Sequence, residues 1–208
     1  MNTNLPQRLA ARLTQPLPGW HAQATFQPEL SFGRHRGPAS PNARAAAVLL
    51  VIYPHEGAWH MPLIRRPADM PYHPGQVSFP GGMIEPGEDG RQAALREYTE
   101  ELGAPAHELQ VLGRLTDLYL FASNHTVEPW LAATRVRPAW EPCAREVDLL
   151  LEIPISHLLD RESLGSIIRA NGELSFVAPC FLWHSDAIWG ATSMILAELL
   201  AVLDGCEL

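Results

Sequence analysis

Cysteine is scarce in this sequence, and its few positions argue against two classes of protein. The three cysteines are Cys143, Cys180 and Cys206, an odd number with no close-set pair. No Cys-x-x-Cys pair and no Cys/His cluster has the spacing of zinc ligands. The pattern therefore disfavours a disulfide-stapled scaffold and a zinc module, and it predicts reduced thiols in a cytoplasmic protein.

Long apolar runs and basic tracts are also absent. The longest apolar run, residues 45–53, is much shorter than the roughly 20 residues that cross a bilayer. Residues 1–13 lack the charged-then-apolar order of a secretion signal. A net charge of −8 without a basic segment disfavours binding to nucleic acid or to a membrane surface. A small anionic substrate remains compatible, because a bound metal supplies positive charge locally.

What is present is the composition of a globular domain, with 47% hydrophobic residues in 208. The apolar spacing over residues 5–13 predicts a short amphipathic helix. Residues 14–42 are rich in proline, glycine and polar residues, which is typical of an arm along a surface. We therefore expect a helix and arm over residues 1–42, packed on one domain over residues 43–208. The arm is also where we would expect a homodimer contact.

Short apolar runs bounded by turn residues predict an α/β fold with a mixed sheet. We expect strands over residues 45–53, 59–65, 77–79, 111–120, 127–134 and 146–153, and a late hairpin from residues 174–179 and 181–184. Helical spacing is found over residues 91–102, 156–160 and 192–203. Strands and helices alternate irregularly, which favours a mixed sheet between helices over a parallel, doubly wound one.

The most informative stretch is residues 82–104, GMIEPGEDGRQAALREYTEELGA. A turn-rich piece leads into the predicted helix, and Gly103 stands where a helix C-terminal glycine belongs. Ala94, Leu95 and Tyr98 share one apolar face of this helix, which is suited to packing on a core.

Three carboxylates, those of Glu97, Glu100 and Glu101, lie beside that apolar face. Glu97 and Glu101 are one turn apart, so both can reach one ion. In a plain helix these like charges repel by a few tenths of a kcal/mol per pair, and this helix has no lysine to offset them. A divalent cation removes the penalty, and carboxylate oxygens suit Mg²⁺ or Mn²⁺. The helix by itself favours a solvated acidic face over a metal site.

The wider pattern resembles the Nudix box. Its charged positions and glycines are present in order as Gly82, Glu88, Arg96, Glu97, Glu100, Glu101 and Gly103. Only Tyr98 and Ala104 depart, where a larger aliphatic residue is usual. The resemblance implies a Nudix fold, an α/β/α sandwich with a mixed β-sheet. It also implies a loop-helix-loop magnesium site that hydrolyses a diphosphate linked to a nucleoside.

The run before the box, HPGQVSFPGG over residues 73–82, resembles the extra motif of the coenzyme A pyrophosphatase branch of Nudix enzymes. Leu63 and Arg66 fit the front of that motif. Further similarity downstream extends the resemblance over residues 43–203, most of the chain.

Two positions depart from the branch motif. Ile64 stands where a threonine is usual, and Met70-Pro71 replaces a Leu-Arg pair. The missing arginine matters because a cation there is suited to bind a 3′-phosphate or the diphosphate. Arg65 or Arg34 are the candidates to replace it.

The resemblance also implies roles for individual residues. We expect Glu97 and Glu101 to bind Mg²⁺ directly, Glu100 to be a third ligand or to lie behind the first two, and the Gly81 carbonyl to complete the shell. Arg96 is expected to orient a glutamate, with Glu88 as the candidate. The expected substrate contacts are Arg66, His73, Gln76, Ser78 and Gly81. For Gln76 and Ser78, an ordinary strand entering a turn is the alternative.

The general base that activates water is not assigned by the box. Glu97, Glu146 at the start of a predicted strand, and Glu141 in the preceding loop are the candidates, since each carries a carboxylate. For Glu146, a surface charge at a strand end is the alternative.

Three functions remain open from the sequence. The first is Mg²⁺-dependent cleavage of coenzyme A or acyl-CoA into 4′-phosphopantetheine and adenosine 3′,5′-bisphosphate. The second applies the same chemistry to another nucleoside diphosphate derivative, such as an ADP-sugar or a dinucleotide. The third is a non-catalytic Nudix module that senses a ligand. Such a module would be expected to lose box carboxylates, and none is missing here.

Overall fold

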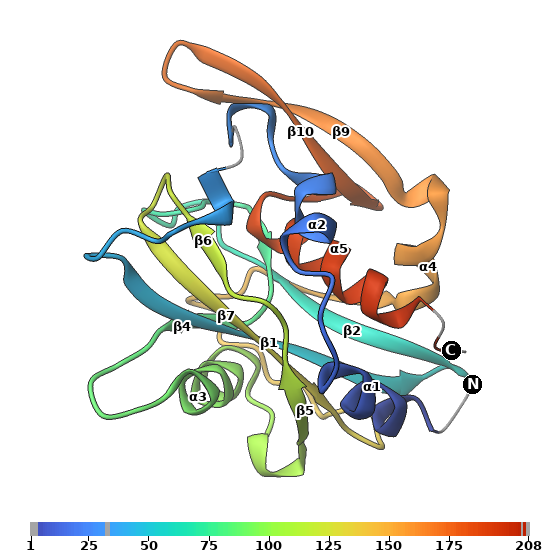
Figure 1. The fold of residues 1–208 in the computed structure, drawn as a ribbon. Coiled ribbons are helices and arrows are strands. Elements are labelled where there is room, and N and C mark those ends of the chain that lie inside the picture. Colours follow the sequence, from blue (N-terminus) through green and yellow to red (C-terminus); the bar gives the residue numbers. More distant parts are fainter. Residues whose placement is uncertain (1–3, 32–33, 205, 207–208) are drawn as a thin grey trace.

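The computed structural model describes residues 4–31, 34–204 and 206, and its central element is an eight-stranded mixed sheet (Figure 1). The strands are β1 (Arg44–His55), β2 (Ala58–Arg65), β3 (Val77–Ser78), β4 (Gly81–Met83), β5 (Gln110–Arg114), β6 (Leu118–Leu120), β7 (His125–Ala133) and β8 (Leu149–Pro154). Along the sheet the order is β3-β2-β1-β7-β5, with β4 beside β1, β6 beside β7 and β8 beside β2. β1 and β7 run parallel, and the other pairs are antiparallel. The predicted mixed sheet is confirmed.

Helices cover both faces of this sheet, which explains why β1 is apolar along its length. Leu49 and Val51 pack with α3 (Gly90–Leu102) on one side. Leu50 and Ile52 pack with α1 (Leu5–Leu13) and α5 (Ala191–Leu203) on the other. All four side chains are fully buried. The structure is therefore the expected α/β/α sandwich. Within the described residues, no helix combines the length and apolar character needed to span a membrane.

A second, three-stranded antiparallel sheet projects from the sandwich and differs from the prediction (Figure 1). It contains β9 (Leu164–Asn171), β10 (Leu174–Trp183) and β11 (Asp186–Trp189). The predicted hairpin with a turn at Pro179–Cys180 is wrong, because residues 174–183 form one strand. Pro179 predicts the end of a strand, because proline has no backbone N–H to donate to a neighbouring strand. Only that one hydrogen bond is lost, however, so a strand can accept proline at a position where the bond is not needed.

Smaller differences concern element boundaries. The strand predicted over residues 111–120 is divided into β5 and β6. The strand predicted from Glu146 begins only at Leu149, so Glu146 lies in the preceding turn. The short helix expected near residues 156–160 is α4 (Ile155–Leu159). The segment predicted as an arm contains α2 (Trp20–Gln23) and three short 3₁₀ turns at residues 24–26, 29–31 and 34–36. Residues 32–33 of that segment lie outside the described residues.

A buried carboxylate fastens the N-terminal segment to the sandwich. Glu198 of α5 is fully buried. Its Oε1 accepts hydrogen bonds from the backbone N–H groups of Gly19 and Thr116, both at 3.2 Å, and its Oε2 accepts from Gln23 Nε2 at 2.8 Å. The charge is thus satisfied by three donors, two of which belong to the N-terminal segment.

Glu198→Ala is expected to lower the free energy of unfolding by about 3 kcal/mol, because it leaves three donors unpaired at a buried position. Glu198→Gln is expected to cost less, since one oxygen remains as an acceptor. Chemical denaturation measures both, with the exposed Glu162→Ala as a control that should stay within about 0.5 kcal/mol of the parent. A loss for Glu198→Ala no larger than that of the control would contradict the anchoring role.

Candidate active site

The helix that carries the acidic residues has defined ends. Asp89 caps α3 by accepting a hydrogen bond from the backbone N–H of Gln92 at 2.8 Å, while the Gln92 side chain accepts from the Asp89 N–H at 2.8 Å. At the other end Gly103 adopts a left-handed conformation, with φ 68°, and its N–H donates to the Thr99 carbonyl. These caps fix where the helix begins and ends. Within it, Glu97 and Glu101 are four residues apart and therefore face the same direction, one turn apart.

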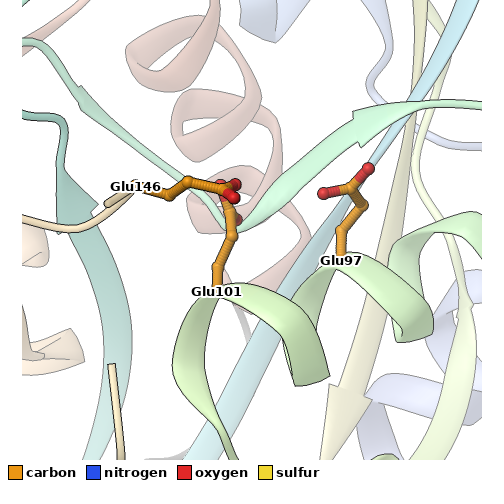
Figure 2. A group of neighbouring side chains, drawn as sticks. All are labelled: Glu97, Glu101 and Glu146. Atoms are coloured by element: carbon orange, nitrogen blue, oxygen red, sulfur yellow. The ribbon is translucent and has the colours of Figure 1, made fainter. Parts of the chain in front are cut away.

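Three carboxylates from two segments converge in front of this helix. Figure 2 shows Glu97 and Glu101 rising from adjacent turns of α3, with Glu146 reaching in from a separate segment. One carboxylate oxygen from each residue lies within 4.8 Å of the other two. Glu97 and Glu101 thus lie together on one face, as their spacing predicts, and Glu146 joins them from the turn before β8.

Burial makes this convergence electrostatically costly. Glu101 is only 1% exposed, and burial raises its pKa to about 8, although the Gly81 N–H donates to its Oε2 at 2.9 Å. Burial also raises the pKa of Glu97, against the opposing effect of the Arg96 guanidinium. Carboxylates held together in this way are suited to a shared cation.

Two glycines beside the cluster lie where a side chain would not fit. A Cβ atom on Gly82 would collide with the carboxylate of Glu97, and one on Gly81 would collide with the backbone of Ala47 and Val48 in β1. The donor set around this space consists of oxygen atoms from three carboxylates. These residues therefore fit a hard divalent cation such as Mg²⁺ or Mn²⁺.

Arg96 ties the loop before α3 to the acidic residues. Its guanidinium donates to Glu88 at 2.7 and 3.2 Å, and to Glu97 at 2.8 Å. It also donates to the Met83 carbonyl at 3.1 Å. The hydrogen bond from Arg96 is the main reason that the pKa of Glu88 is lowered. The expected contact between Arg96 and Glu88 is present, and this geometry is compatible with the predicted orienting role of Arg96.

The structure does not bring Glu100 to the cluster. Its side chain is 54% exposed, and its Oε2 accepts from Arg96 Nη1 at 3.0 Å. Helical geometry explains the difference, because Glu100 projects about 100° away from Glu101 around the axis. The third carboxylate in the group is that of Glu146, so the geometry does not support the expected role of Glu100 as a third ligand.

The expected substrate contacts lie along the chain that leads to Gly81. Arg66 is half-buried, its positive charge acts on Glu101, and its Nε has no hydrogen-bond partner within the described part of the chain. His73 is exposed, and its ring shares a 3.0 Å hydrogen bond with Gln76 Oε1. Ser78 is half-buried at the end of β3. Of this set, Arg66 is therefore the cation whose charge acts on the carboxylate group.

The two arginines considered as replacements for the missing motif arginine are engaged elsewhere. Arg65 donates to Asp148 at 2.8 Å and to Asp186 at 3.2 Å. The Arg34 guanidinium lies 3.8 Å from the centre of the Phe121 ring and donates to the Ser31 carbonyl at 3.0 Å. Neither side chain compensates for Pro71 in this arrangement.

Sequence reasoning missed two features of the site. Gly82 matched the box as a fixed position, but the sequence carried no signal that its missing Cβ makes room for Glu97. The sequence makes Arg65 a candidate substrate cation, whereas in the structure its side chain donates to Asp148, two residues after Glu146. Asp148 and Asp186 are acidic residues that could pair with Arg65, but their positions in the sequence do not indicate that they lie near it.

Comparison with known proteins agrees with the geometry. Residues 43–148 match the model of the NUDIX domain family. The chain is 36% identical over 137 residues to the mitochondrial coenzyme A diphosphatase NUDT8 of Homo sapiens, covering 63% of this chain but only 57% of that protein. It is 34% identical over 163 residues to the Nudix hydrolase NudL of Photorhabdus laumondii, covering 77% of this chain and 85% of that protein. The predicted similarity to the branch that contains coenzyme A pyrophosphatases is confirmed at the level of sequence.

The fold has counterparts among solved structures. The crystal structure of RenU, a Nudix hydrolase from M. smegmatis, superimposes with a TM-score of 0.57 at 20% identity, covering 80% of this chain and 89% of that chain. At this identity the likeness concerns the fold. It agrees with the α/β/α sandwich described above.

Proposed function

Because the chain belongs to the Nudix family, we propose that it is a pyrophosphohydrolase that cleaves the diphosphate of coenzyme A or an acyl-CoA. The products would be 4′-phosphopantetheine, or its acylated form, and adenosine 3′,5′-bisphosphate. The observation that carries the proposal is the convergence of Glu97, Glu101 and Glu146 within 4.8 Å. The similarity to NUDT8 and the intact run over residues 73–82 support coenzyme A as the substrate.

In this proposal, Glu97, Glu101 and Glu146 would hold a divalent cation, Mg²⁺ or Mn²⁺. When bound, the cation supplies the positive charge that the diphosphate oxygens need as the P–O–P bridge breaks. The residues of the chain do the positioning. The Gly81 N–H donates to Oε2 of Glu101, and the Arg96 guanidinium donates to Oε1 of Glu97. Arg66, whose charge acts on Glu101, is suited to bind an oxygen of the diphosphate.

Hydrolysis requires a water oxygen to bond to one phosphorus while the bridging P–O bond breaks and the other phosphate leaves. The proton lost by the water goes to a carboxylate within hydrogen-bond reach. Glu97 and Glu146 belong to the three-carboxylate group, whereas Glu141 is exposed in a loop packed against Gly103 at the end of α3. We therefore propose the base among Glu97 and Glu146.

All three carboxylates of the group come from one chain. The homodimer and the cytoplasmic location remain predictions. Size-exclusion chromatography with light scattering measures the first.

A second candidate function is the same cleavage of another nucleoside diphosphate derivative. It is favoured by Pro71, which stands where the branch motif has an arginine and so leaves one fewer cation for a 3′-phosphate. Arg66 by itself can serve a diphosphate without discriminating what is attached to it.

A substrate panel separates these functions. Purified protein with Mg²⁺ is expected to cleave coenzyme A and acetyl-CoA, with little turnover of ADP-ribose or a dinucleotide, when products are followed by chromatography. Coenzyme A without its 3′-phosphate is the matched control, since its turnover isolates the contribution of that group. Preferred cleavage of ADP-ribose would support the second function, and no turnover of any member would contradict both and favour a non-catalytic module.

A further inference from the structure

Arg65, the last residue of β2, joins three separate segments of the chain. Its Nε donates to Asp148 Oδ2 at 2.8 Å, and its Nη1 donates to Asp186 Oδ1 at 3.2 Å. Its backbone carbonyl accepts from the N–H of Asp148 at 2.8 Å. Asp148 follows the turn that carries Glu146, and Asp186 begins β11 in the second sheet. One side chain thus connects the central sheet, the Glu146 turn and the second sheet.

The Glu146 turn is fastened at both of its ends. At its start, the N–H of Cys143 donates to the carbonyl of Glu101 at 2.9 Å, which attaches the turn to the end of α3. Inside it, the N–H groups of Glu146 and Val147 both donate to the Cys143 carbonyl at 2.9 Å. At its end stand the backbone and side-chain contacts to Arg65. Since Glu146 lies between these two fastenings, loosening either one lets its carboxylate drift from the group.

The chemistry of Arg65 suits a fastening role. A guanidinium is planar and donates in several fixed directions, so it can hold two carboxylates that approach from different segments. The Asp186 side chain is only 11% exposed, which limits competition from water, while that of Asp148 is 49% exposed. Isolated exposed ion pairs contribute little to stability. The effect of this pair is therefore expected in the geometry of the turn and much less in the free energy of unfolding.

We propose that Arg65 is a positioning residue that sets Glu146 within the three-carboxylate group by holding Asp148 against β2. The significance of this placement for catalysis rests on the proposed function, whereas the placement itself does not. Asp186 stiffens the arrangement from the second sheet, so part of the precision of the site comes from β11. Contacts that orient metal-binding side chains typically change affinity or activity by 10–100-fold when removed, which sets the scale of the expected effects.

The first test needs neither metal nor substrate. In Arg65→Met, hydrogen exchange of the backbone amides in residues 143–148 of the metal-free protein is expected to become at least about 10-fold faster. Arg137→Met is the matched control, because it removes another arginine–carboxylate pair, at 2.6 Å to Glu152 of β8, which includes no residue of this turn. Unchanged exchange in Arg65→Met, or an equal rise in the control, would overturn the proposal.

The second test uses turnover of the diphosphate that the parent protein cleaves best. Arg65→Met is expected to lower kcat by about 10-fold with KM changed less than about 2-fold, and Arg65→Lys to recover part of the loss. Asp186→Asn is expected to have a smaller effect than Asp148→Asn, because only Asp148 belongs to the segment that carries Glu146. A rise in KM at unchanged kcat would mark Arg65 as a substrate contact and contradict the positioning role.

A double-mutant cycle decides whether Arg65 acts through Glu146. If it does, Arg65→Met costs little further activity in a Glu146→Gln background, because the residue it positions has already lost its charge. Full additivity of the two losses would overturn the proposal. Absence of turnover in the parent protein would refute the proposed function, and the exchange experiment would then still decide whether Arg65 fastens the turn.

Discussion

Glu101→Gln is expected to lower Mg²⁺-dependent diphosphate hydrolysis by at least about 100-fold while the protein remains folded. The carboxylate of Glu101 belongs to the three-carboxylate group, and glutamine replaces its charge with a neutral amide of the same shape. The hydrogen bond from the Gly81 N–H survives, because the amide oxygen can still accept it. The loss therefore reflects the missing charge and not a missing contact to the scaffold.

The same variant is expected to make the metal-free protein more stable at alkaline pH. Burial raises the pKa of Glu101 from its ordinary value of 4.5 to about 8 in the folded state. Between these values the folded chain keeps a proton that the unfolded chain has released. The free energy of unfolding then falls as pH rises, by at most about 1.4 kcal/mol per pH unit. Glu101→Gln lacks this proton, so its advantage over the parent should be absent near pH 4, grow from about pH 4.5 to pH 8, and then level off.

Two measurements on one set of variants check this result. Turnover with Mg²⁺ reports the loss of activity, and denaturation in the presence of a chelator at several pH values reports stability. Glu85→Gln is the control, since it removes an exposed charge from the loop before α3. Near-normal turnover in Glu101→Gln would refute its assignment as a metal ligand. A stability difference that shrinks as pH rises would contradict the raised pKa.

Gly82→Ala is expected to lower turnover by about 10–100-fold and to weaken binding of Mg²⁺ or Mn²⁺, with little change in thermal stability. The new Cβ would occupy space now taken by the Glu97 carboxylate. Because that carboxylate is the far end of a flexible side chain, it can swing away without disturbing β4. The carboxylate would then leave the three-carboxylate group and lose its 2.8 Å hydrogen bond from Arg96.

Substitutions at the two neighbouring positions distinguish an effect on the site from an effect on the stability of the fold. Gly81→Ala is expected to destabilise the whole protein, since its Cβ would meet the backbone of Ala47 and Val48, which cannot move without breaking the pairing of β1 with β4. Met83→Ala, at a position that is 38% exposed in the same strand, should change neither property by much. Calorimetric titration with Mn²⁺ and a thermal melt distinguish the three variants. Normal metal affinity in Gly82→Ala would show that metal binding does not require the present position of the Glu97 carboxylate.

Local patterns carried much of the fold. Neighbouring residues determine three features that could therefore be predicted. These are the apolar run of β1, the amphipathic spacing of α1, and the capped helix α3 with Gly103 at its end. The hairpin of β9 and β10 could not be predicted, because a proline such as Pro179 locally indicates the end of a strand. Whether a strand accepts a proline depends on the pairing of that strand with its neighbours. The start of β8 was placed too early for a similar reason, since pairing with β2 decides where that strand begins.

The sequence by itself determined that two glutamates one helical turn apart follow a glycine turn, because helix periodicity sets that spacing without reference to the rest of the chain. Tertiary structure decided which third carboxylate completes the group. Glu100 is adjacent to Glu101 in sequence but turns outward to Arg96, whereas Glu146, far along the chain, is brought in by a turn fastened to Glu101 and Arg65. The burial that raises the pKa of Glu101 is likewise a property of the assembled layers, since it depends on what packs around the carboxylate.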